Sequence, residues 1–222
     1  MSGIKKTAVT AGHRKKGFRS AARMRRIKVS LLIVGIVLII LIAAAAICAT
    51  YMGKRAYRDF LLATHPVMYS EYVEKYAAEY GMDKYVIYAF IRTESGFDAN
   101  AVSDTGARGL MQLMETTFDW VKFRLGDGDE IVYDDMFDPE MNIRYGAYLV
   151  DYLTERFGCI ETAAAAYFSG IGEVGGWLEN SEYSKDGVHL DNIPSRNCAH
   201  YVNKINTALS NYIELYASER KD

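Results

Sequence analysis

An uncharged, strongly apolar run over residues 29–49 is the feature that most constrains how this chain folds. At about 1.5 Å per residue, a helix of this length crosses the roughly 30 Å hydrocarbon core of a bilayer. The run is also longer than the apolar core of an ordinary cleavable signal. The sequence therefore predicts a basic tail over residues 1–28 and a transmembrane anchor over residues 29–50. The small residues at 43–46 leave a cleaved signal peptide as the alternative.

The charge of the tail predicts which side of the membrane each part occupies. All charged residues among the first 28 are basic. Because basic flanks tend to stay in the cytoplasm, we expect a single-pass cell-membrane protein with a cytoplasmic N-terminus and an extracytoplasmic domain. Without the tail, the chain has 16 basic and 28 acidic residues and thus a formal charge of about −12. This acidity argues against a nucleic-acid partner, whose phosphates need basic surface.

The part of the chain beyond the anchor has the pattern of an all-α domain. After a juxtamembrane linker, residues 51–65, apolar residues recur at helical spacing and strand patterns are scarce. Capping residues, prolines and glycines mark the helix ends: Asp83 and Asp138-Pro139 at starts, Gly81, Gly158 and Gly170 at stops. The fold class predicted is therefore all-α, with one globular domain over residues 66–218 behind a single N-terminal transmembrane helix.

One predicted helix ends in a glutamate on its apolar face. From Asp83 onward, Val86, Ile87, Phe90, Ile91 and Glu94 share one face at helical spacing, and Ser95-Gly96 follows as a stop. Burial and the negative end of the helix dipole would both raise the pKa of Glu94. A carboxylic acid that stays protonated near neutral pH is what general-acid cleavage of a glycosidic bond requires. The alternative is a helix-ending Glu that turns out to solvent.

Four sequence blocks follow one another from Glu94 onward. Residues 94–97 read Glu-Ser-Gly-Phe, and residues 106–117 read Gly-Ala-Arg-Gly-Leu-Met-Gln-Leu-Met-Glu-Thr-Thr. Residues 166–178 read Ala-Tyr-Phe-Ser-Gly-Ile-Gly-Glu-Val-Gly-Gly-Trp-Leu, and Ile193-Pro194 precedes Tyr201-Val202. This order resembles the lytic transglycosylases with a goose-type-lysozyme-like catalytic domain, which cleave bacterial peptidoglycan. The resemblance spans nearly the whole predicted domain and implies a lysozyme-like fold.

The resemblance also implies roles for individual residues. Glu94 would be the catalytic acid and base for cleavage of the β-1,4 bond between N-acetylmuramic acid (MurNAc) and N-acetylglucosamine (GlcNAc), with a 1,6-anhydro sugar as product. The residues expected to contact the substrate are Ser103, Met111, Gln112, Tyr167 and Tyr201. Gly106 and Gly109 would let the backbone approach a sugar. Peptidoglycan glycan strands are the expected partner, and the single-span anchor is compatible with recruitment to an unidentified envelope-spanning machinery.

The resemblance has departures, which keep two other functions open. The family's asparagine after Ala-Tyr is Phe168 here and the following alanine is Ser169, while the glutamate and threonine of the last block are Asn197 and Cys198. A catalytically weak peptidoglycan-binding module is therefore one alternative. A hydrolytic muramidase on the same fold is the other, and it would need a second carboxylate, for which Asp98, Asp104 and Asp119 are candidates.

Neither the cysteines nor the histidines indicate a metal or a cofactor. Cys159 and Cys198 lie in the exterior part and either form a disulfide or remain buried thiols. His13, His65, His189 and His200 lack metal-ligand spacing. The chemistry implied by the resemblance needs neither a metal nor a cofactor.

Overall fold

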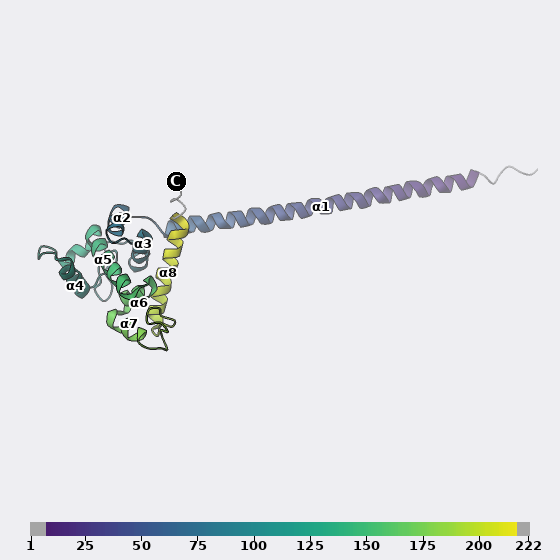
Figure 1. Ribbon diagram of the computed structural model, residues 1–222. Coiled ribbons are helices and arrows are strands. Elements are labelled where there is room, and N and C mark those ends of the chain that lie inside the picture. The colour runs from purple at the N-terminus through teal and green to yellow at the C-terminus, as the bar shows by residue number, and fades with distance from the viewer. Residues whose placement is uncertain (1–7, 217–222) are drawn as a thin grey trace, which may run out of the picture. The chain divides into compact units, whose positions relative to one another are not determined.

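The chain divides into two units, Met1–Asp59 and Phe60–Asp222, in a computed structural model (Figure 1). The structure describes the backbone of residues 8–216 and the side chains of residues 23–216. Part of the predicted tail, residues 1–7, and the last two residues of the predicted domain, 217–218, lie outside the described backbone.

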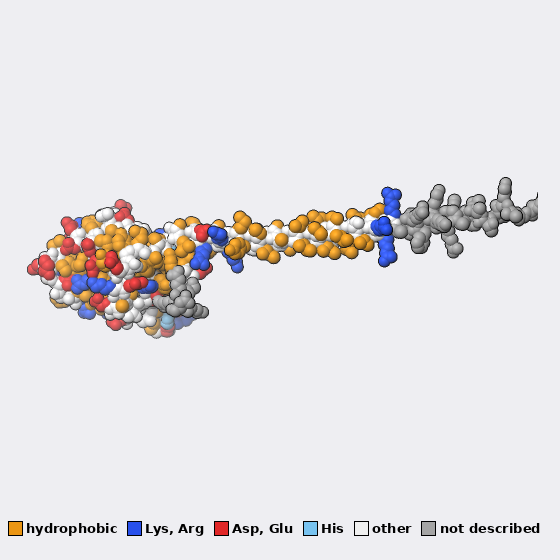
Figure 2. All heavy atoms as spheres, turned by 90° about the horizontal axis from the view of Figure 1, so that it is seen from above, with side chains coloured by type: hydrophobic (Ala, Val, Ile, Leu, Met, Phe, Trp, Pro, Cys, Tyr) orange, Lys and Arg blue, Asp and Glu red, His pale blue; other side chains and the backbone are white. Residues whose placement is uncertain are grey.

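Helix α1, Ala8–Thr64, contains the predicted anchor and the predicted linker. Residues 51–64 are therefore helical. The segment Arg23–Thr64 of α1 is long and apolar enough to cross a membrane, judged by length and composition. Figure 2 shows hydrophobic side chains along this helix, with Lys and Arg side chains at both ends of the apolar stretch. The boundaries between tail, anchor, linker and domain stay predictions.

The second unit is built from short helices, as the sequence pattern predicts. They are α2 (Ser70–Glu79), α3 (Lys84–Glu94), α4 (Glu115–Leu125), the 3-10 helix η1 (Tyr133–Phe137), α5 (Pro139–Phe157), α6 (Ile160–Ser169), α7 (Ile171–Leu178) and α8 (Arg196–Tyr216). Residues 8–216 contain no β-strand, and their only β-type pairings are two isolated bridges that join Arg108 to Val102 and to Leu113. The all-α prediction is confirmed.

Two of the predicted helix starts have side-chain caps. The Asp83 carboxylate accepts a hydrogen bond from the backbone N–H of Tyr85 at 3.0 Å, and Asp138 accepts one from Met141 at 3.0 Å. Each cap satisfies an N–H group that the first turn of a helix leaves without a partner. These caps fix where α3 and α5 begin.

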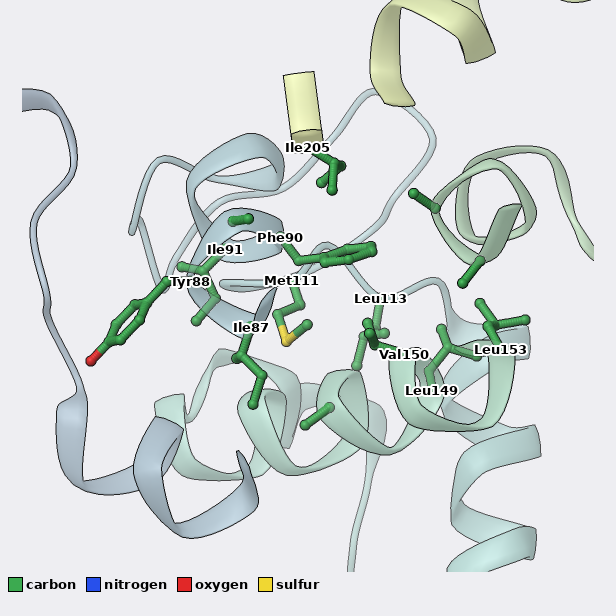
Figure 3. Close-up of a cluster of buried hydrophobic side chains, with 14 of the residues drawn as sticks. Ile87, Tyr88, Phe90, Ile91, Met111, Leu113, Leu149, Val150, Leu153 and Ile205 are labelled. Carbon is green, nitrogen blue, oxygen red and sulfur yellow. The ribbon is translucent and has the colours of Figure 1, made fainter. Parts of the chain in front are cut away.

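The core forms where α3, α5, α6 and α8 pack together. Figure 3 shows Ile87, Phe90 and Ile91 of α3 in one cluster with Val150 and Leu153 of α5, with Met111 and Leu113 of the loop between the two groups. All seven side chains are buried. Each contributes on the order of 1.5–3 kcal/mol relative to an exposed position. This packing fixes the rotation of α3 and with it the position of Glu94.

Helix α7 was not predicted from the sequence. It contains Gly172, Gly175 and Gly176, which have low helix propensity. Val174 and Trp177 are buried in the core, so tertiary packing holds the helix. Trp177, which belongs to the third sequence block, therefore covers the core.

The two exterior cysteines are free thiols in the structure. The Cys159 thiol donates to the Thr162 hydroxyl at 3.1 Å, and the Cys198 thiol donates to the Ala165 carbonyl at 3.7 Å. Of the two alternatives from the sequence, the structure has the unbridged one.

Candidate active site

The end of α3 holds Glu94 against the loop that follows. The backbone N–H of Ser95 donates to Ile91 at 3.1 Å and closes the helix. The Ser95 hydroxyl donates to the Leu110 carbonyl at 2.8 Å and accepts from the N–H of Phe97 at 3.1 Å. The serine after the glutamate therefore ties the helix end to the loop.

The Glu94 carboxyl is partly buried and has one strong hydrogen bond. The Tyr201 hydroxyl of α8 donates to Glu94 Oε1 at 2.5 Å. Burial raises the pKa of Glu94 to about 7, while the hydrogen bond from Tyr201 and the charge of Lys204 act in the opposite direction. Near neutral pH both the acid and the carboxylate are therefore populated. The alternative of a glutamate turned out to bulk solvent does not fit this environment.

No other carboxylate acts on Glu94 in the part of the chain with described side chains. The charged and polar groups that shift its pKa are Tyr201 and Lys204. Asp98 lies on the exposed turn after the helix, where it accepts a hydrogen bond from the N–H of Asn100 at 2.9 Å. A single carboxyl group thus dominates the chemistry of this site.

Tyr167 of α6 lies close enough to the same carboxyl group to be affected by its charge. Its hydroxyl donates to the Met111 carbonyl at 2.6 Å, and its ring centroid is 4.9 Å from that of Phe90. Burial and the nearby charge of Glu94 raise the pKa of Tyr167 well above its ordinary value, and the pKa of Tyr201 rises for the same reasons. Both tyrosines stay protonated over the working pH range and act as donors.

Met111 does not line the site with its side chain, contrary to the prediction of a substrate contact. It is fully buried, and a Cβ added to Gly146 of α5 would lie only 2.2 Å from its sulfur (Figure 3). Its contribution is a backbone one, because its carbonyl accepts from Tyr167. The apolar thioether is more stable in the core than at the edge of a polar site.

Gln112 and Ser103 also bond within the protein. The Gln112 side-chain nitrogen donates to the carbonyls of Ala101 and Gly109 at 3.1 and 2.9 Å. The Ser103 hydroxyl accepts from the N–H of Ala107 at 3.0 Å and lies 3.0 Å from the Thr105 hydroxyl. Ser103 therefore does not bond to Glu94, and the expected sugar contacts of both residues stay predictions.

The close approach that Gly109 permits is to the protein itself. At its φ of +75°, an added Cβ would lie 2.0 Å from the Met136 carbonyl and 2.3 Å from the Asn142 side-chain nitrogen. Gly106 has a φ of +89° with open space around it. The sequence reasoning that both glycines serve a sugar therefore misses the structural role of Gly109.

Asn142 is the residue that holds this loop, and sequence reasoning missed it. It is fully buried, its amide nitrogen donates to the carbonyls of Arg108 and Met136 at 3.0 and 2.8 Å, and its amide oxygen accepts from the N–H of Met111 at 2.8 Å. The available signal in the sequence was an amide side chain on the core-facing side of α5, one residue before Ile143. Asn142 positions the loop whose Met111 carbonyl accepts the hydrogen bond from Tyr167.

A family comparison gives this arrangement a context. The model of the transglycosylase SLT domain matches residues 71–189, more than half of the chain. The chain belongs to the transglycosylase SLT family.

Curated relatives and solved structures agree with this assignment. The soluble lytic murein transglycosylase of Escherichia coli strain K12 is 30% identical over 159 residues, which cover 71% of this chain and 24% of that protein. The membrane-bound lytic murein transglycosylase C of Yersinia pestis strain Pestoides F is 30% identical over 183 residues, which cover 73% of this chain and 48% of that protein. The chain thus spans about a quarter to a half of these relatives.

The solved structures show that the SLT domain here has their lysozyme-like fold. An inactive Glu-to-Gln mutant of lytic transglycosylase Slt from Pseudomonas aeruginosa is 26% identical with a TM-score of 0.61, over 69% of this chain and 25% of that one. The 70-kDa soluble lytic transglycosylase of Escherichia coli is 25% identical with a TM-score of 0.62, over the same shares.

The departures of this SLT domain from the family pattern meet beside Tyr201. The Phe168 ring, 48% exposed, lies with its centroid 4.9 Å from that of Tyr201. Its neighbour Ser169 forms a hydrogen bond with the buried Cys198 thiol. Burial raises the pKa of Cys198, and this hydrogen bond acts in the opposite direction. The two departing blocks therefore contact each other and leave the bond from Tyr201 to Glu94 in place.

Proposed function

We propose that the chain is a membrane-anchored lytic transglycosylase that cleaves the β-1,4 bond between MurNAc and GlcNAc in peptidoglycan and forms a 1,6-anhydro-MurNAc end. The observation that carries the proposal is the partly buried Glu94, whose pKa of about 7 lets one group serve as acid and then as base. Membership of the transglycosylase SLT family supports the substrate class.

The proposed reaction uses Glu94 twice. The protonated Glu94 gives its proton to the glycosidic oxygen as the bond from C1 of MurNAc breaks, and the acetamido oxygen of the same sugar stabilises C1. The 6-hydroxyl of that sugar then attacks C1, and the ionised Glu94 takes its proton. The carboxyl group returns to its starting state, and no water is consumed.

The surroundings of Glu94 suit this sequence better than hydrolysis. An inverting hydrolase needs a second carboxylate to activate water, and none among residues 23–216 acts on Glu94. The Tyr201 hydroxyl stabilises the carboxylate that forms after the first proton transfer. Tyr167, whose pKa the charge of Glu94 raises, donates to the Met111 carbonyl.

The anchor part of the proposal rests on α1. Residues 29–49 would cross the cell membrane, with the basic tail in the cytoplasm and the SLT domain outside. The relatives named membrane-bound lytic murein transglycosylase C support a membrane location. Protease added to intact cells tests the orientation, because it should digest the SLT domain and spare a tag on the N-terminus.

Product analysis tests the chemistry. Purified sacculi are digested with the full chain in detergent, and the released muropeptides are analysed by mass spectrometry. We expect anhydro ends. Reducing ends one water heavier would identify a hydrolase and contradict the proposal, and release no faster than with Glu94→Gln would identify a binding module.

A further inference from the structure

A pocket of about 380 Å³, lined mainly by polar and charged residues, opens between α3 and α8 next to the proposed catalytic residue. Thr93, the residue before Glu94, lines it, and so does His200, the residue before Tyr201. Lys204, also in the lining, is close enough to Glu94 to affect its pKa. The pocket therefore lies near Glu94, which is not itself part of the lining.

The charge of the pocket is positive and uncompensated. Its lining includes Arg92 and Lys204 and contains no Asp or Glu. Within the part of the chain with described side chains, neither cation forms an ion pair with a carboxylate. The chain beyond the tail has a formal charge of about −12, so this pocket is a local exception. Such a concave cationic site attracts anions that the rest of the surface repels.

The side chain of Arg92 is held in place for binding. Its Nε donates to the Thr64 carbonyl. The two terminal nitrogens of the guanidinium have no hydrogen-bond partner among the described residues, so their N–H groups can bind an anion. A guanidinium fixed in this way matches the two oxygens of a carboxylate and loses little side-chain entropy on binding.

The pocket wall also contains a hydrogen-bonded pair, His65 and Asn211. The buried His65 ring lies 3.2 Å from the Leu61 carbonyl through Nδ1 and 3.2 Å from the Asn211 amide nitrogen through Nε2. Burial and the charge of Arg92 lower the pKa of His65, so Nδ1 donates to Leu61 and Nε2 accepts from Asn211. His65 therefore adds no positive charge to that of Arg92 and Lys204.

We propose that this pocket binds a carboxylate of the peptide stem carried by the MurNAc residue at the scissile bond. The inference rests on the proposed function, since it concerns the same substrate. The sugars of a glycan strand offer hydroxyls and amides, whereas the stem offers carboxylates within reach of the reacting sugar. Free phosphate has the same anionic chemistry, and the experiment separates it from the stem.

The experiment compares two substrates with the full chain in detergent: peptide-bearing glycan strands, and strands freed of peptide by an amidase. We expect the parent to have the higher kcat/KM on peptide-bearing strands. Lys204→Gln should lower the ratio of the two kcat/KM values about fivefold, and Arg92→Gln with Lys204→Gln about tenfold, as expected for charge-assisted contacts in a partly solvated pocket. Any effect on the pKa of Glu94 acts on both substrates and cancels in the ratio.

Controls separate the pocket from the fold and from the general reaction. Lys204 is exposed on α8, so its single variant tests charge without removing the bond that Arg92 makes to Thr64. Arg156→Gln removes an exposed charge outside the pocket and should leave the ratio unchanged. Inorganic phosphate should inhibit cleavage of peptide-bearing strands more strongly than cleavage of bare strands.

Each outcome decides between the two proposals. An unchanged ratio in Lys204→Gln, or phosphate inhibition that is equal on both substrates, overturns the pocket alone, because cleavage of bare strands still supports the proposed function. A parent that cleaves neither substrate overturns the proposed function and the pocket with it.

Discussion

The end of α3 and the loop that follows it use their polar groups in opposite ways. At the end of α3, burial keeps the Glu94 carboxyl poised between two protonation states, with one hydrogen bond from Tyr201. In the loop, polar groups are bonded within the protein: the Gln112 side chain donates to Ala101 and Gly109, and the backbone of Arg108 and Met111 bonds to Asn142 of α5. The first region is arranged for chemistry and the second for stability.

This difference shows that a residue can belong to a functional sequence block without contacting a substrate. Loop residues of the sequence block that follows Glu94, Met111 above all, are buried in the core and support the site from there. A substitution at the end of α3 should therefore change activity with little loss of stability. One in the loop should change stability first.

The largest expected effect is the loss of activity caused by the substitution Glu94→Gln. General-acid and general-base catalysis contributes roughly 10²–10⁴-fold, so we expect release of muropeptides to fall about a thousandfold. The glutamine oxygen still accepts from Tyr201, so the fold should be kept. The rate of release from sacculi measures the effect, with circular dichroism as the folding control. A variant that retains a tenth of the parent rate would contradict the catalytic role given to the end of α3.

In the loop, we expect the substitution Gly109→Ala to lower the stability of the protein. The added methyl group meets the Met136 carbonyl at 2.0 Å on a backbone with a φ of +75°. We expect a loss of at least ~3 kcal/mol in the free energy of unfolding. Gly106→Ala is the matched control, because it has a similar φ of +89° and open space, and it should lose only about 1 kcal/mol. Equal melting temperatures for the two variants would remove the structural role given to Gly109.

Stability should depend on pH through Glu94 with a definite sign. Its pKa in the folded protein is about 7, above the ordinary value of 4.5, so the folded state binds the proton more tightly than the unfolded state. The parent should therefore lose stability relative to Glu94→Gln as the pH rises from about 4.5 to 7, by up to about 3 kcal/mol. Chemical denaturation of both proteins at pH 4 and pH 8 measures this. A parent that gains stability relative to the variant over that range would reverse the sign.

A smaller effect is expected on the pH profile of Tyr201→Phe. The Tyr201 hydroxyl stabilises the carboxylate and so lowers the pKa of Glu94. Without it that pKa rises, and the alkaline limb of kcat/KM, which follows loss of the acid, should move to higher pH. The comparison sharpens if the limb moves while the melting temperature changes little. A limb that stays near pH 7 would show that the hydrogen bond does not tune Glu94.

Much of the fold is predictable because its signals are local. Asp83 and Asp138 cap helices within three residues of themselves, and the apolar spacing of α3 fixes which face carries Glu94. Helix α7 was missed because its three glycines oppose a helix that tertiary packing then stabilises. Local rules predict an element when its own residues determine it.

The site was predicted less completely because contacts distant in sequence decide it. Glu94, Tyr167 and Tyr201 lie in one group, as the resemblance implies. Whether Gln112 points to a sugar or to Ala101 depends on the φ of +48° that the folded loop imposes. Asn142 of α5 bonds to the loop, and Lys204 of α8 acts on Glu94. For Asn142, the only local signal was a polar residue at the spacing of core residues.

The pKa of Glu94 itself is the most direct test of the account. Infrared difference spectra between the parent and Glu94→Gln, recorded with the full chain in detergent, isolate the carbonyl band of this protonated carboxyl group. The account predicts that the band disappears with a midpoint near pH 7. A midpoint close to the ordinary value of 4.5 would contradict it, because Glu94 would then be ionised before it could donate its proton.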